Sequence, residues 1–106
     1  MEHEFSEKDR SLLVHTLFQI QSFASKLSAD VKRNKSELDA KMLVHVLHNM
    51  IQLEEYIKPI MKEEELSVYN ISSIILSAML EELDPILKRI LSVEEWKIKL
   101  SKQYSQ

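Results

Sequence analysis

The most constraining feature of this sequence is that it contains no glycine among 106 residues, and only two prolines. Average usage would supply about seven glycines in a chain of this length. Glycine serves tight turns, helix C-caps, bulges and phosphate-binding loops, because it adopts positive φ at little steric cost. A sheet protein of this size would need several of them. The sequence therefore predicts few turns, an all-α fold and no glycine-rich phosphate-binding loop.

Length and composition predict one globular domain covering residues 1–106. Apolar residues make up 44% and charged residues 29%, which is ordinary globular usage and argues against disorder. The absence of cysteine excludes a disulfide framework and a thiolate metal site. The first ten residues lack an apolar core, so no signal peptide is expected. No stretch approaches the ~20 apolar residues of a membrane span, and we expect a cytoplasmic protein.

A first helix is predicted from Ser6, which forms an approximate capping box with Asp9. The apolar positions that follow are spaced 4-3-4-3-4, a mean period of 3.5 that is typical of helices packed on helices. They are Leu13, Leu17, Ile20, Ala24, Leu27 and Val31. The opposite, polar face holds Ser11, His15, Gln19, Ser22 and Lys26. Residues 28–35 are interpreted as a connection, in which Asn34 can take the left-handed conformation.

Ser36 and Asp39 repeat the capping pattern and predict a second helix. Two apolar seams run along it: Leu43, Val46, Met50, Leu53, Ile57 and Ile60, and beside them Ala40, Val44, Leu47 and Ile51. Together they cover roughly 200° of the helix, more than the stripe of an ordinary surface helix, so we expect this helix to be central. Pro59 predicts a kink or short break near residues 56–58. The charged residues 62–65 are expected to end the helix.

A third helix is expected to begin near Ser67 or Asn70, either of which can act as N-cap. Its apolar residues form two seams: Val68, Ile71, Ile75 and Ala78, and Leu76, Met79 and Leu83. Asp84-Pro85 is a standard helix-start signal, yet the apolar period continues through it. The chain either kinks near Pro85 and continues or reverses into a fourth helix. Ser92 and Glu95 form a further capping box before Trp96, Ile98 and Leu100. The sequence thus predicts an antiparallel bundle of three to four long helices.

Two histidine patterns are candidates for chemistry. His48, followed by Asn49 and Gln52, resembles histidine phosphotransfer modules, helical bundles with one exposed histidine in mid-helix; the resemblance implies phosphotransfer signalling through His48. Arg10 and His15 have the Arg-x(4–6)-His spacing of helical-bundle ribonucleases, which implies RNA cleavage.

Metal and acid–base sites have weaker support in the sequence. His45 and His48 share a helical face, but bundle metal sites need inward-facing Glu-x-x-His motifs, and the sequence has none. The acidic clusters, among them Glu54-Glu55, fall on polar faces or at helix ends, where we expect them to be solvated. We therefore predict no catalytic residue, no metal ligand and no cofactor.

The remaining feature is surplus apolar surface on the second and third helices. In a three- or four-helix monomer part of it stays exposed as a patch, which usually marks a partner site. The sequence favours a small non-enzymatic protein-binding module: a regulator, adaptor, inhibitor or immunity-type factor, or a homodimer. The alternatives are the phosphotransfer bundle using His48 and the ribonuclease using Arg10 and His15. With a net charge of −3, no nucleic-acid partner is expected, and no small-molecule substrate is evident.

Overall fold

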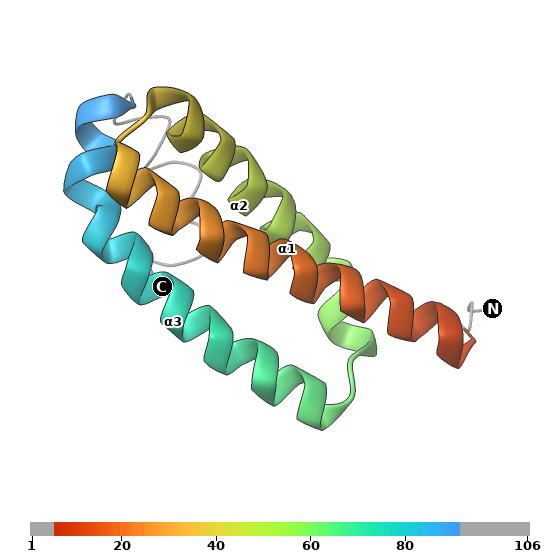
Figure 1. Ribbon diagram of the computed structural model, residues 1–106. Coiled ribbons are helices and arrows are strands. Elements are labelled where there is room, and N and C mark those ends of the chain that lie inside the picture. The colour runs from red at the N-terminus through yellow and green to blue at the C-terminus, as the bar shows by residue number, and fades with distance from the viewer. Residues whose placement is uncertain (1–5, 92–106) are drawn as a thin grey trace.

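The computed structural model describes residues 6–91, and this part of the chain is helical almost throughout. It consists of α1 (Glu7–Asn34), α2 (Glu37–Ile57), a short 3-10 turn η1 (Lys58–Ile60) and α3 (Glu63–Ile90) (Figure 1). There is no strand within residues 6–91, so the prediction of an all-α fold is confirmed. The predicted capping box at Ser92 and the apolar residues after it lie outside the described residues.

α1 packs against both other helices, whereas α2 and α3 contact each other only sparsely. Figure 1 shows α2 running antiparallel to α1, and α3 running in the same direction as α1. The prediction that the second helix is central is therefore wrong for residues 6–91. The reason is that α1 buries two polar residues, Gln21 and Ser28, beside its apolar seam, and these widen its contact surface in a way that the apolar pattern does not reveal.

The hydrophobic core is built from regularly spaced residues of all three helices. Its buried members are Val14, Leu17, Ala24, Leu27 and Val31 of α1, Ala40, Leu43, Val44, Leu47, Met50 and Ile57 of α2, and Tyr69, Leu76, Leu80, Leu83, Leu87 and Leu91 of the α3 segment. Burying one such large apolar side chain contributes about 1.5–3 kcal/mol. The 3-4 spacing seen in the sequence of the first two helices thus corresponds to packing in the core, confirming that part of the prediction.

Both predicted serine caps are present. The Ser6 hydroxyl accepts a hydrogen bond from the Asp9 N–H at 3.1 Å, and the Ser36 hydroxyl accepts one from the Asp39 N–H at 3.2 Å. Each satisfies one of the N–H groups that the first turn of a helix leaves without an intrahelical partner.

The predicted connection over residues 28–35 is largely wrong, because α1 continues to Asn34. Ser28 and Val31 are buried within it, and the Ser28 hydroxyl donates to the Ala24 carbonyl at 2.8 Å. The left-handed residue is Lys35, with φ of 53°, rather than Asn34. The polar side chains that suggested a loop occupy the exposed side of the last helical turns.

The start of α3 also differs from the prediction. The helix begins at Glu63 with Lys62 as N-cap, one turn before the expected Ser67. The Glu65 carboxylate accepts the Lys62 N–H at 2.8 Å, which supplies the cap. Three glutamates in the first turn lie at the positive end of the helix dipole, where negative charge is stabilising. The expectation that this charged stretch ends the second helix is therefore wrong: α2 already ends at Ile57, and the stretch begins α3.

The two prolines occupy different positions. α2 ends at Ile57, and Pro59 lies in η1. Pro85 lies inside α3, which is assigned as one helix from Glu63 to Ile90. The chain therefore does not reverse at Asp84-Pro85.

Candidate protein-binding face on α3

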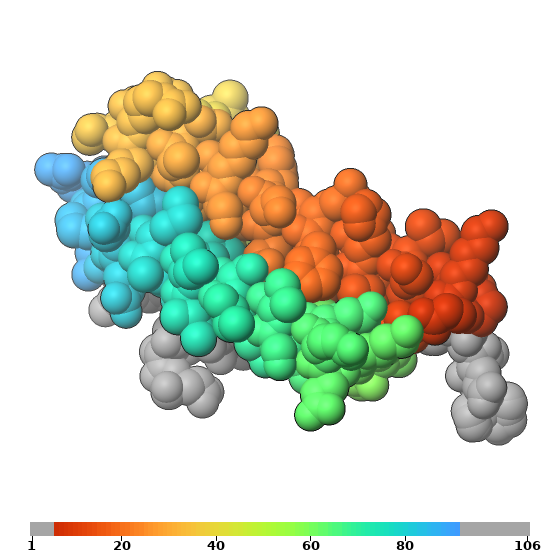
Figure 2. Space-filling view, turned by 60° about the horizontal axis from the view of Figure 1, so that its bottom comes forward, coloured from red at the N-terminus to blue at the C-terminus, as the bar shows by residue number. Residues whose placement is uncertain are grey.

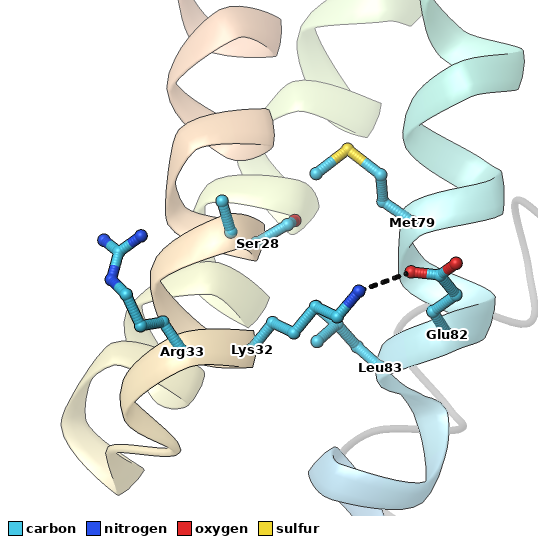
Figure 3. Close-up of a pocket in the computed structure, with 7 residues that line it drawn as sticks. Ser28, Lys32, Arg33, Met79, Glu82 and Leu83 are labelled. Carbon is cyan, nitrogen blue, oxygen red and sulfur yellow. Dashed lines mark hydrogen bonds and ion pairs between the residues drawn. The ribbon is translucent and has the colours of Figure 1, made fainter.

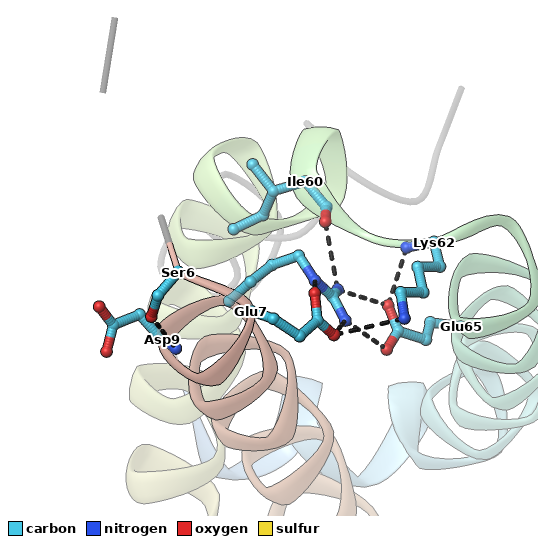
Figure 4. Close-up of polar contacts among 7 residues, drawn as sticks. Ser6, Glu7, Asp9, Ile60, Lys62 and Glu65 are labelled. Carbon is cyan, nitrogen blue, oxygen red and sulfur yellow. Dashed lines mark hydrogen bonds and ion pairs between the residues drawn. The ribbon is translucent and has the colours of Figure 1, made fainter. Parts of the chain in front are cut away.

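An ion-pair cluster fixes the start of α3 against the start of α1 (Figure 4). The Arg10 guanidinium donates to both Glu65 oxygens, at 2.8 and 3.2 Å, and to the Ile60 carbonyl at 3.3 Å. It also donates to both Glu7 oxygens, at 3.1 and 2.8 Å. Lys62 Nζ lies 3.3 Å from Glu7 Oε2. One largely buried cation thus joins α1, η1 and α3.

The electrostatics of this cluster favour its charged forms. Hydrogen bonds from Arg10, and then from Lys62, lower the pKa of Glu7 to about 2. The same guanidinium lowers the pKa of Glu65, assisted by the Lys62 backbone N–H. The two carboxylates in turn raise the pKa of Arg10. All three groups stay ionised at neutral pH, so the anchor is present under ordinary conditions.

Tyr69 fixes the first half of α3 from inside the core. Its side chain is fully buried, and its hydroxyl donates to Glu54 Oε2 at 2.6 Å. The Phe18 ring meets the Tyr69 ring edge-on at 5.5 Å, and Lys58 Nζ lies 5.6 Å from the ring centroid. The expectation that Glu54 is solvated is wrong: it is only 6% exposed, because it lies one turn after Met50 on the core side of α2.

Gln21 adds a second buried polar contact one turn further along. Its amide nitrogen donates to the Tyr69 carbonyl at 3.1 Å and to the Ser73 hydroxyl at 2.9 Å. Tyr69 and Ser73 lie four residues apart, on the same side of α3. These contacts set the rotation of α3 about its axis, with Tyr69, Ser73 and Leu76 facing α1. The sequence reasoning missed Gln21, Glu54 and Tyr69 because each of them pairs with a residue on another helix.

The opposite side of α3 is apolar and exposed. Four β-branched side chains, which we call the outer face of α3, are each more than half exposed: Val68 at 54%, Ile71 at 59%, Ile74 at 70% and Ile75 at 58%. Ala78 continues this face. Figure 2 shows α3 as a ridge alongside α1. The predicted seam of Val68, Ile71, Ile75 and Ala78 is thus the exposed one, and the seam containing Leu76 and Leu83 is buried.

A groove lies between the end of α1 and the second half of α3 (Figure 3). It is lined by Ser28, Ala29, Lys32, Arg33, Met79, Glu82 and Leu83. Lys32 and Glu82 form an ion pair across it at 3.1 Å, and both side chains are exposed. The Ser28 hydroxyl is already used on the Ala24 carbonyl. The groove is therefore an apolar depression crossed by a surface ion pair.

The histidines of the predicted sites lie on the surface of the helices. His45 and His48 are exposed on α2, and His15 is exposed on α1. Within residues 6–91, no group of three or more His, Asp or Glu side chains could hold a metal ion. Arg10, the proposed partner of His15, is directed at Glu65 of α3 instead. The structure thus gives Arg10 a structural role.

No family model, no curated protein and no solved structure matches this chain. Among the helices of the described part, α3 is the one long and apolar enough, by length and composition alone, to cross a membrane. Its apolar window is 22% buried inside the structure, and a single helix of this kind is weak evidence for a membrane span, because core helices and signal sequences meet the same criterion.

Proposed function

We propose that this chain is a small non-enzymatic protein-binding module, a regulator, adaptor or inhibitor, that binds its partner through the outer face of α3. The observation that supports the proposal is the set of four β-branched side chains standing more than half exposed on one side of a helix. Scattered exposed apolar residues are normal, whereas contiguous ones mark interaction sites.

The energetics favour this interpretation. Fully burying a Val or Ile side chain is worth about 1.5–3 kcal/mol relative to leaving it exposed. Each residue of the outer face is already partly covered. Burial by a partner would therefore contribute about half of this free energy per residue. Central apolar contacts of this kind supply most of the binding energy in protein interfaces, while the polar rim adds selectivity.

The test is a charge placed in the middle of the outer face. Ile71→Asp/Ile74→Asp should fold, because both side chains point away from the core, but should lose hydrophobic-dye binding and capture of the native partner. Leu38→Asp is the matched control, since Leu38 is 70% exposed but lies on α2. Retention of the partner by the double variant, with no dye binding by the unaltered protein, would contradict the proposal.

One second candidate has an observation in its favour. His48 is exposed in the middle of α2, as a phosphorylatable histidine has to be. Incubation with a small-molecule phosphodonor, followed by intact mass measurement, decides it. Phosphotransfer requires one added phosphate that is lost in His48→Gln, and an unchanged mass rejects it.

A further inference from the structure

We propose that the partner presents an amphipathic helix whose apolar stripe is flanked at both ends by lysine or arginine. This inference rests on the proposed function and specifies the chemistry of the partner. It follows from how charge is distributed around the outer face of α3, which is acidic at both ends of the apolar stretch.

The acidic ends lie on the same side of α3 as the apolar residues. Glu64 precedes Val68 by four residues, and Glu82 follows Ala78 by four residues. This spacing places each glutamate one turn beyond the apolar stretch and on its face. Glu63 and Glu81 lie beside them, and all four glutamates are exposed. Along its length, the outer face thus has acidic side chains at each end and apolar side chains between them.

Basic groups lie near the second acidic end, where Arg33 lines the same groove as Glu82 and the last turn of α3 is basic, so the first end, at Glu63 and Glu64, is the more acidic of the two. Lys32 of α1 pairs with Glu82, and Lys88 pairs with Asp84. Arg89 lies almost two turns beyond Glu82. Charged residues at the rim of an interface influence which partner binds, because like charges placed opposite one another are costly, and they also influence the association rate.

The shape of the outer face fits a helix. From Val68 to Ala78 the apolar stretch is about 15 Å long, or nearly three turns at 1.5 Å per residue. An exposed ridge of side chains at 3-4 spacing packs into the groove between the ridges of another helix. A helix that docks in this way makes its contacts through apolar side chains at positions i, i+3, i+4 and i+7.

A second copy of this chain fits less well. An antiparallel pair of outer faces centred between Ile71 and Ile75 would place Glu64 of one copy opposite Glu82 of the other. A parallel pair would place Glu64 opposite Glu64. The parallel arrangement brings like charges together at the ends, and the antiparallel one places Glu64 against a carboxylate that Lys32 already pairs. A negatively charged membrane surface would be repelled by the same glutamates, since such surfaces attract basic helices.

The experiment uses two synthetic peptides with identical leucine stripes at 3-4 spacing, one with lysines at both ends and one with glutamates. Each is titrated into the full chain by fluorescence anisotropy. The lysine peptide should bind about tenfold more tightly at low salt, and the difference should shrink at high salt as the charges are screened. Ile71→Asp/Ile74→Asp should remove binding of both peptides.

Charge reversal makes the test specific. Glu64→Lys/Glu81→Lys should reverse the peptide preference while leaving the Lys32–Glu82 pair intact. Glu55→Lys, at an exposed position on α2, is the control and should not change the preference. Equal binding of the two peptides, with both lost in the aspartate variant, would overturn the charge inference and leave the proposed function standing. Binding of neither peptide would count against both. Two other outcomes would overturn the inference: dimerisation that depends on protein concentration, and capture of the protein on anionic vesicles. If Ile71→Asp/Ile74→Asp abolishes either of them, the outer face binds a second copy or a membrane instead.

Discussion

At the scale of single residues, a few polar contacts decide which side of α3 faces water. Tyr69 and Gln21 contribute buried hydrogen bonds, and Arg10 contributes a cluster of charged ones. The pairings between helices were not predictable from the sequence, because their partners lie 15 to 55 residues apart; the Arg10–Glu7 pair lies within one turn of α1. Glu54 in particular looks like a surface acid until its contact with Tyr69 is known.

Tyr69→Phe should destabilise the protein by about 1–3 kcal/mol, the range for removing a hydrogen-bond partner from a buried polar group. The change keeps the ring and its contact with Phe18, so the loss reports the hydroxyl bonded to Glu54. Urea unfolding followed by circular dichroism measures it. Tyr56→Phe is the control, since Tyr56 is 75% exposed, and equal effects of the two changes would refute the role assigned to Tyr69.

The Arg10 cluster predicts a pH dependence. The pKa of Glu7 is lowered from 4.5 to about 2, and that of Glu65 is also lowered. The folded state therefore binds fewer protons than the unfolded state in this range. The stability that the carboxylates contribute is present above about pH 4.5 and is lost as the pH falls toward 2.

Glu65→Gln should lower the stability at neutral pH and flatten its fall on acidification. The measurement is the free energy of unfolding in urea between pH 2.5 and 7, compared with the unaltered protein. An identical pH slope in the two proteins would show that Glu65 makes no ionised contact with Arg10.

At the scale of the elements, the sequence is informative about helix interiors and less so about their ends. The apolar spacing of α1 and the caps at Ser6 and Ser36 were predictable, because they depend on neighbours within one helix. The polar run at the end of α1 was misread, because the solvent side of a helix and a loop have similar composition. On α3 both seams are apolar, so long-range contacts, among them those of Tyr69 and Gln21, decide which one is buried.

The turn between α1 and α2 offers a matched pair of substitutions. Lys35 adopts φ of 53°, a conformation that costs a non-glycine residue roughly 1–2 kcal/mol. Lys35→Gly should therefore raise the stability by about 1 kcal/mol. Asn34→Gly, one position earlier and still within α1, should not stabilise the protein, because glycine is a poor helix former. Thermal unfolding distinguishes them, and the reverse order would move the left-handed position to Asn34.

At the scale of the whole molecule, α1 joins a bundle whose other two helices scarcely touch. Leu17 is fully buried on α1, whereas Leu12 is 55% exposed on the same helix. Leu17→Ala should cost about 2–5 kcal/mol, the usual range for a core leucine. Leu12→Ala should cost under about 1 kcal/mol. Equal losses in denaturant unfolding would contradict the packing described for α1.

The candidate site was only partly predictable. Surplus apolar surface on the third helix was evident from its two seams, and that expectation led to the outer face. The position of this face on α3 was not predictable, since it depends on the rotation of α3 about its axis. The histidine candidates came from local sequence patterns. They stay predictions, because neither the spacing nor the exposure of a histidine shows phosphotransfer or RNA cleavage.

The most direct test of the central claim uses the absence of cysteine from the chain. Ile71→Cys and Ile74→Cys each introduce one thiol on the outer face of α3, and Leu76→Cys introduces one on the buried side. In the folded protein a thiol reagent should label the first two at rates close to those of the unfolded chain, and Leu76→Cys far more slowly. Protection of the thiols at positions 71 and 74 to the level of position 76, at all protein concentrations, would show that the outer face is already covered and would contradict the account.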